Sequence, residues 1–233
     1  MESEILPYVD SCKQEVKNKI SELLTSTSTK QLAESAFKYH FTQSKTSSDF
    51  QEYYYSMVNN RENFLASKDF FRTFKQKYSL QGIDTNYLDR LENNKKQILQ
   101  LIDTCDLAIL YFRYFAKAQI RRGNQTTPKR LGSFFAKLVH TFRPDEYCAL
   151  DNPIKNHFGL SSESFYIAFT TVSYAYKEWA SENPHLIHTI RSELDNIPRA
   201  KSYSSQTTNL KLLDLIFWKQ ANNGPYQVAG AVE

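Results

Sequence analysis

The lysines and arginines of this 233-residue chain are unevenly distributed along it. Residues 107–144 contain eight of them and no aspartate or glutamate, so this stretch carries a charge of +8. The rest of the chain sums to −4, and the total of +4 therefore hides a strongly basic stretch. Such a concentration of cations is typical of a surface that binds phosphates. We call these eight residues the basic belt: Arg113, Lys117, Arg121, Arg122, Lys129, Arg130, Lys137 and Arg143.

The spacing of three belt residues predicts how they are presented. Arg113, Lys117 and Arg121 are four residues apart, so in a helix they share one side. We expect this side to bind the phosphate backbone of DNA or another nucleic acid without strong sequence choice. Two alternatives remain open. The belt could instead bind an acidic protein partner, or it could be a solvated surface that only keeps the chain soluble.

Asp151 lies at the predicted start of a short helix. It precedes Asn152 and Pro153, a pattern that predicts a helix N-terminus, with proline in the first turn and a side chain that caps the helix. Capping requires no chemistry. His140 and His157 flank it in sequence and form a weak candidate for an acid–base pair with it.

The segment around this aspartate has a recognisable pattern. Residues 127–160 read TPKRLGSFFAKLVHTFRPDEYCALDNPIKNHFGL and resemble the core of the helix-hairpin-helix base-excision DNA glycosylases. The resemblance implies that Gly132 marks the hairpin, that residues 134–142 form the apolar helix, and that Asp151 is the catalytic carboxylate. It covers about 15% of the chain. The lysine that bifunctional members use as a Schiff-base nucleophile has no counterpart, because Lys129 precedes Gly132 and Lys137 comes a turn too late.

Other kinds of site have little support in the sequence. The three cysteines are far apart and form no CxxC pair, which disfavours a disulfide scaffold or a zinc site. His185 and His188 are three apart but no third ligand is evident, and no Walker loop, GxGxxG or HExxH motif occurs. We therefore predict neither a metal nor a cofactor. Without a signal-like N-terminus or a long apolar run, we expect a cytoplasmic protein with no membrane partner.

The elements that position these residues are predicted to be helices. Apolar residues recur at three- and four-residue steps almost throughout, and no clear alternating strand is visible. From Asp84 to Arg122 we expect one long helix, or two that break near Asp103. The fold class is all-α: a globular domain of about nine to eleven helices with a helix-hairpin-helix-like centre. Its expected parts are an N-terminal helical region (1–82), a helical core containing the basic segment (83–221) and a tail (222–233).

Together these features predict a DNA-binding protein with a degenerate glycosylase-like module that acts within a larger complex. The first alternative is a non-catalytic interaction subunit, contacting protein partner subunits, of a bacterial antiviral-defence or genome-maintenance assembly. The second is an active base-excision glycosylase. An enzyme is the less favoured expectation, because capping alone accounts for Asp151.

Overall fold

Helical spacing of apolar residues produces helices along nearly the whole chain. The computed structural model describes residues 2–25, 28–80, 82–122 and 125–223. Within these ranges the chain forms fourteen α-helices and one two-stranded antiparallel ribbon, which confirms the predicted all-α class. Ten of those described helices have more than six residues, in agreement with the expected nine to eleven.

The first part of the chain contains five helices. In α1 the side chains of Val9, Val16 and Ile20 are fully buried, as their spacing predicts. Ser44 caps α3 by accepting the Ser47 N–H. The bounds are α1 (Glu2–Leu24), α2 (Thr29–Lys38), the π-helical turn η1 (Tyr39–Gln43), α3 (Lys45–Met57), α4 (Arg61–Ala66) and α5 (Phe70–Lys77).

The middle of the chain departs from the sequence-based prediction. Asp84 caps α6 and α7 ends at Asp103, both as expected. The helical segment also breaks at Asn94, between α6 and α7, which was not predicted. It does not reach Arg122, because it ends in a π-helical turn at Phe115 and the chain then becomes extended. The bounds are α6 (Thr85–Asn93), α7 (Lys95–Asp103), α8 (Leu107–Leu110), η2 (Tyr111–Phe115), β1 (Ala118–Arg122) and β2 (Gln125–Lys129).

The physical reason for this departure lies in the residues that follow the turn. Two threonines and Pro128 occupy β2, where β-branching and a fixed φ favour extended backbone over helix. The two strands pair from Ala118 with Lys129 to Arg122 with Gln125. The chain therefore enters α9 from a β-ribbon, and the expectation of no strands was wrong.

The last part of the chain contains the helices that lie at the centre of the molecule. Gly132 begins α9, where an added Cβ would lie 2.1 Å from the ring of Phe165, so only glycine fits. The predicted tail starts later than Asn222, because α14 includes Asn223; residues 224–233 lie outside the described residues. The bounds are α9 (Gly132–Phe142), α10 (Asn152–His157), α11 (Phe165–Glu182), α12 (Pro184–Asp195), α13 (Pro198–Lys201), the 3-10 turn η3 (Ser204–Gln206) and α14 (Asn209–Asn223).

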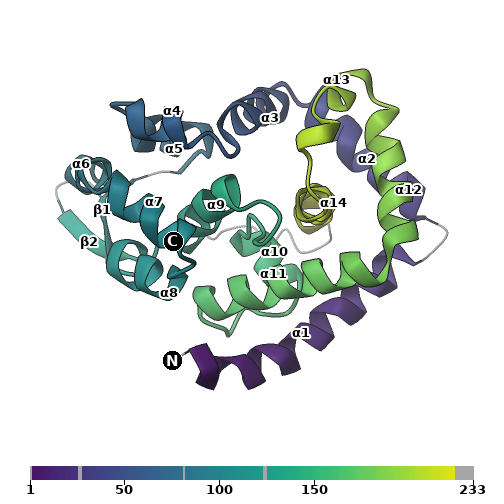
Figure 1. Ribbon diagram of the computed structural model, residues 1–233, viewed down its shortest axis with the longest axis horizontal. Coiled ribbons are helices and arrows are strands. Elements are labelled where there is room, and N and C mark those ends of the chain that lie inside the picture. The colour runs from purple at the N-terminus through teal and green to yellow at the C-terminus, as the bar shows by residue number, and fades with distance from the viewer. Residues whose placement is uncertain (1, 26–27, 81, 123–124, 224–233) are drawn as a thin grey trace.

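The long helices surround α9, α10 and α14 (Figure 1). Helix α1 packs along α11, α2 packs along α12, and α14 contacts α2, α10 and α11. In this view α9 lies between the β-ribbon and α14. One continuous hydrophobic core joins residues from both sides of Gly82, from Val16 to Phe217. This arrangement places one side of α14 against η1 and α3, where the candidate site forms.

Candidate functional site

Two charged residues occupy an otherwise apolar stretch of α14. Lys211 and Asp214 are three residues apart, so they share one side of the helix, and they are only 4% and 5% exposed. Together with Trp218 they line a pocket of about 280 Å³, which we call the α14 pocket. Residues of η1, α3 and α9 form the facing walls. Its size is close to the lower end of small-molecule sites, about 300–1,000 Å³.

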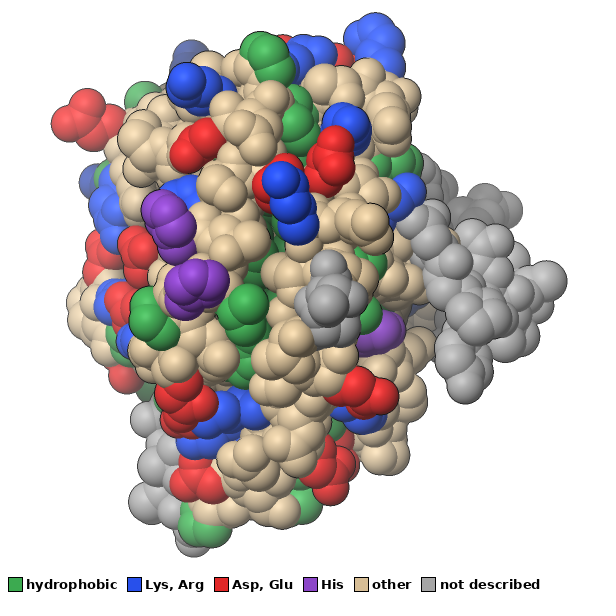
Figure 2. Space-filling view, turned by 90° about the vertical axis from the view of Figure 1, so that its right-hand side faces the viewer, with side chains coloured by type: hydrophobic (Ala, Val, Ile, Leu, Met, Phe, Trp, Pro, Cys, Tyr) green, Lys and Arg blue, Asp and Glu red, His purple; other side chains and the backbone are tan. Residues whose placement is uncertain are grey.

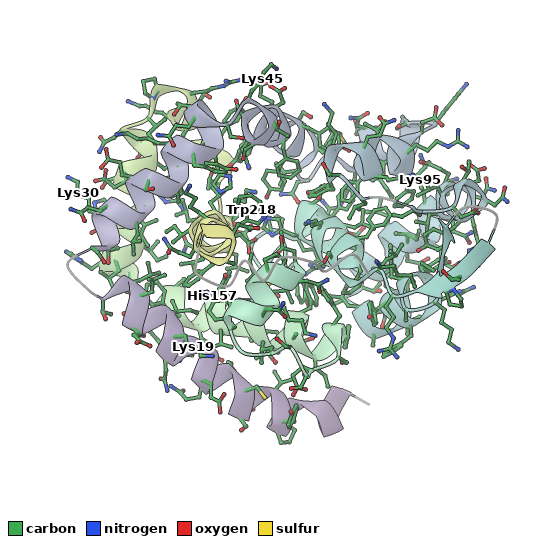
Figure 3. All side chains as sticks on the ribbon, turned by 180° about the vertical axis from the view of Figure 1, so that it is seen from behind. Lys19, Lys30, Lys45, Lys95, His157 and Trp218 are labelled. Carbon is green, nitrogen blue, oxygen red and sulfur yellow. The ribbon has the colours of Figure 1, made fainter. Side chains whose placement is uncertain are left out.

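The α14 pocket combines aromatic rings with positive charge. Its aromatic walls come from Tyr39, Phe50, Tyr78 and Trp218. Trp218 lies on α14 at the centre of the molecule (Figure 3), and its ring stacks 5.9 Å from that of Tyr39. Three amines line the pocket, those of Lys77, Lys137 and Lys211, against the single carboxylate of Asp214. The excess of amines over carboxylates favours an anionic ligand, and the aromatic walls favour one with a flat part that can stack on them.

Burial shifts the protonation of both charged residues of α14. Loss of hydration lowers the pKa of Lys211 from 10.5 to about 8, and the charge of Lys137 adds to this effect while Asp214 opposes it. Burial also raises the pKa of Asp214 from 3.8 to about 7, against the opposing effects of the Ala149 N–H and Lys211. Both groups therefore exchange protons near neutral pH.

These shifts predict how stability depends on pH. Between about pH 4 and 7 the folded state keeps the Asp214 proton that the unfolded state loses, so stability falls as pH rises. Between about pH 8 and 10.5 the unfolded state holds the extra Lys211 proton, so stability rises with pH. Asp214→Asn should reduce the fall between pH 4 and 7, measured as the urea midpoint. The same substitution at the exposed Asp195 is the control, and an unchanged fall in Asp214→Asn would contradict the burial effect.

Two buried acceptors in the pocket wall lack donors. Asp214 accepts the Ala149 N–H at 2.7 Å through Oδ2, but its Oδ1 has no partner among the described residues. The same holds for Oε1 of Gln51, which lines the opposite wall from α3. A buried acceptor without a donor costs about 1–3 kcal/mol. These two oxygens are suited to accept hydrogen bonds from N–H groups of a ligand.

Two neutral histidines hold the pocket walls together. His140 Nδ1 lies 2.7 Å from the Tyr147 carbonyl, so it carries the proton, and Nε2 accepts from the Tyr54 hydroxyl at 3.0 Å. His40 has the reverse tautomer: Nε2 donates to the Leu215 carbonyl, and Nδ1 accepts from a serine hydroxyl. Burial lowers the pKa of each to about 3, so both stay uncharged at neutral pH.

Asp151 lies behind the wall of the α14 pocket and caps α10. Its Oδ1 accepts the Ile154 N–H at 3.1 Å, and its backbone is extended, as at other N-caps. Burial raises its pKa, while the charge of Lys137 and the Ile154 N–H act in the opposite direction. Ile154 and Lys137 line the pocket, but Asp151 does not. His140 contacts Tyr54 and Tyr147 and lies 3.9 Å from Asp214.

In the structure the residues of the basic belt lie on different elements. Arg113, Lys117 and Arg121 do not share a helix side, because the helix ends at Phe115 and Arg121 belongs to β1. Arg113, Lys117 and Arg130 are exposed, and Lys129 is half-buried at the end of β2. The side chains of Arg121 and Arg122 lie outside the described residues, although the backbone places both in β1.

The last two belt residues lie elsewhere. Lys137 lines the α14 pocket, with its amine 5.2 Å from the centre of the Tyr78 ring. Arg143 has a structural role: it donates to the carbonyls of Ile102 and Asp103 at the end of α7 and pairs with Glu146. The guanidinium of Arg143 is thus hydrogen-bonded within the protein.

Sequence reasoning did not single out the pocket residues Lys211, Asp214, Gln51 and Lys77. Lys211 and Asp214 were detectable as charges within the apolar run LKLLDLIF of α14. Gln51 and Lys77 give no such signal, because polar residues at their spacing are ordinary on the surface of a helix. Only the packing of α3 and α5 near α14 identifies them.

A larger hollow of about 880 Å³ lies where α12, η3 and the start of α14 meet. Its arginine, Arg191, donates to the carbonyls of Ser204 and Thr207 and to the side chain of Asn209, so its hydrogen bonds are used within the protein. Because the α14 pocket contains buried titratable groups and unpartnered acceptors, we take it as the candidate site.

Metal sites, membrane-spanning helices and similar proteins were also sought. Among the described residues, no group of three or more His, Cys, Asp or Glu side chains is placed to hold a metal ion. No helix in the described ranges is long and apolar enough to cross a membrane. Comparisons with family models, curated proteins and solved structures found no match.

Proposed function

We propose that this protein binds nucleic acid, DNA in the first place, and holds one unstacked nucleotide in the α14 pocket. The observation that carries the proposal is the composition of that pocket: aromatic walls, three amines and two unpartnered acceptors. Each feature suits one part of a nucleotide. A base stacks on aromatic rings, its N–H groups donate to buried oxygens, and its phosphate is attracted by amines.

The exposed belt residues support a path for the nucleic-acid backbone. Arg113, Lys117 and Arg130 are exposed at or before the end of the β-ribbon where β1 begins and β2 ends, and α9 leads from this end to Lys137 in the pocket wall. The face formed by the opposite end of the molecule differs, because basic and acidic side chains alternate over it (Figure 2). The end of the molecule that contains the exposed belt residues is therefore the better surface for a polyanion.

Part of the glycosylase-like pattern supports the same proposal, whereas the chain before Gly132 forms the β-ribbon and not the first helix of a helix-hairpin-helix. An apolar helix, a non-helical stretch and a capped short helix follow one another, as the resemblance implies for residues 132–157. The carboxylate of Asp151 caps α10, which favours a degenerate module over an active base-excision enzyme. Asp151→Asn keeps a good capping residue, so a strand-processing activity that this variant loses while it still folds and binds DNA would favour the enzyme.

The salt dependence of binding tests the proposal. A complex with about six phosphate contacts should show log K falling with log salt at a slope near −5, followed by fluorescence anisotropy. Replacing Arg113, Lys117 and Arg130 with glutamine should reduce that slope by about three.

The matched control replaces three exposed lysines from α2 and α13 with glutamine: Lys30, Lys38 and Lys201. This control should bind like the unmodified protein. Absence of binding at low salt, or an affinity that does not depend on salt, would contradict the proposal.

A protein-interaction subunit is the second candidate, and one observation favours it. Ile109 and Phe112 are each 53% exposed and three residues apart, next to Arg113. Exposed apolar side chains beside a cation suit a partner with an apolar and acidic surface. Size exclusion after co-expression with neighbouring genes tests this candidate, and Phe112→Ser should then abolish co-elution.

A further inference from the structure

Three buried polar side chains of the α14 pocket come from two facing helices. Lys211 and Asp214 share one side of α14, and Lys211 Nζ lies 4.1 Å from the centre of the Tyr54 ring and 5.7 Å from that of Phe50. Gln51 lies between these two aromatic residues in α3, so the amine faces the turn of α3 that contains Gln51. The pocket therefore presents one amine and two acceptor oxygens close to one another.

These three groups do not satisfy one another. Among the described residues, no hydrogen bond or ion pair holds the Lys211 amine, and neither Asp214 Oδ1 nor Gln51 Oε1 has a donor. All three side chains are at most 5% exposed. The other two buried lysines of the described residues differ, because Lys155 donates to two carbonyls and Lys95 contacts a carbonyl and a carboxylate. The unused groups of the pocket are therefore available to a ligand.

One donor and two acceptors complement the hydrogen-bonding edge of guanine. That edge carries a carbonyl oxygen, the N1–H group and the N2 amine, which are one acceptor followed by two donors. Adenine, cytosine, thymine and uracil each have a single donor group on the corresponding edge. The guanine carbonyl can accept from Lys211, while N1–H and the N2 amine donate to Asp214 and Gln51.

The start of α3 gives the same pocket a place for a phosphate. Thr46 and Ser47, from the first turn of this thirteen-residue helix, line the pocket, and a helix N-terminus attracts anions through its N–H groups. The exposed Lys77 and the half-buried Lys137 add positive charge. Thr46 precedes Gln51 by five residues, or about 7.5 Å along the helix, which leaves room for a sugar between base and phosphate.

We propose that the α14 pocket binds guanosine 5′-monophosphate as a free ligand, and that this nucleotide competes with nucleic acid for the pocket. The base edge pairs with the three buried groups, the ring stacks on the aromatic wall of Tyr39 and Trp218, and the phosphate lies at the start of α3. Because the pocket offers a contact to each part of a mononucleotide, binding there does not require a strand. The competition rests on the proposed function, whereas binding of the free nucleotide does not.

Calorimetric titration with four nucleoside 5′-monophosphates tests the choice of base. The full chain is titrated at about pH 7.5, where most of the Asp214 carboxyl is ionised because its pKa is about 7. Guanosine 5′-monophosphate should bind at least about tenfold more tightly than the adenosine, cytidine and uridine nucleotides, which carry the same phosphate. Equal affinities for the four, or no binding of the guanosine nucleotide at millimolar concentration, would overturn the proposal.

Inosine 5′-monophosphate lacks only the N2 amine and therefore tests the contact with Gln51. The unmodified protein should bind it about fivefold more weakly than the guanosine nucleotide, and the absence of this preference would contradict the contact whether or not any variant folds. Gln51→Leu should bind both nucleotides alike, because the acceptor is gone. The same change at the exposed Gln100 of α7 is the matched control and should keep the preference. A preference that survives in folded Gln51→Leu would overturn the assignment of Gln51.

Competition separates this inference from the proposed function. Saturating guanosine 5′-monophosphate should raise the Kd of an oligonucleotide, measured by anisotropy, by at least about fivefold, while the adenosine nucleotide at equal concentration should not. An oligonucleotide affinity that bound guanosine nucleotide leaves unchanged would overturn the competition. If oligonucleotides bind but the guanosine nucleotide does not, this inference fails and the binding proposal stands. If only the guanosine nucleotide binds, the free-ligand site stands and the nucleic-acid proposal fails.

Discussion

Replacing Phe134 with alanine is expected to lower the free energy of unfolding by about 3–5 kcal/mol. Phe134 lies in α9 and is fully buried. Its ring is 5.2 Å from that of Phe74, 5.6 Å from Phe115 and 6.0 Å from Phe71. Removing it leaves a cavity where α5, η2 and α9 meet, and aromatic neighbours on three sides cannot close it without moving their helices. Urea denaturation followed by circular dichroism measures the loss.

Phe112→Ala is the matched control for this change. The same side chain is removed, but at a position that is 53% exposed, so we expect a change within about 0.5 kcal/mol. Equal losses at the two positions would contradict the packing of α9 at the centre of the core.

The second large effect concerns Trp218 and binding. Trp218→Ala is expected to weaken nucleic-acid binding by about 1–3 kcal/mol, a factor of about 5 to 150 in Kd. The reason is that Trp218 and Tyr39 provide the stacked aromatic wall of the α14 pocket. Without the indole, a base that enters the pocket loses its largest flat contact. Anisotropy at constant salt gives the two affinities.

Trp218→Phe keeps an aromatic ring and should recover most of that affinity. Because Trp218 is half-buried, thermal unfolding of each variant separates a binding effect from a loss of fold. Unchanged affinity in Trp218→Ala, with the fold intact, would place the nucleotide outside the α14 pocket.

Local signals in the sequence predicted much of the fold. The apolar stripe of α1 is buried as its spacing predicts. Asp84 and Asp151 cap helices as predicted, because capping depends only on contacts within the chain segment: each side chain accepts the N–H of the residue three positions later. The β-ribbon was missed for a physical reason. Arg113, Lys117 and Arg121 have helical spacing by coincidence, whereas the extended conformation depends on pairing with residues 125–129.

The candidate site was less predictable than the fold. Charge counting located the basic belt, but Arg143 is bound to carbonyls at the end of α7, about 40 residues earlier in the chain. The α14 pocket depends on contacts between still more distant segments, such as His40 with the Leu215 carbonyl, 175 residues away. No pattern within α14 shows that Lys211 and Asp214 face Gln51. Such long-range packing is visible only in three dimensions.

The indole resonances of the two tryptophans test the central claim most directly. The chain has two, and Trp179 is buried with its Nε1 donating to Ser21 Oγ at 2.9 Å, so it reports on the fold alone. In protein labelled with ¹⁵N-tryptophan, added oligonucleotide should shift the Trp218 signal and leave that of Trp179 in place. The shift should saturate at the concentrations that saturate anisotropy. An unchanged Trp218 signal while anisotropy reports binding would contradict a nucleotide in the α14 pocket.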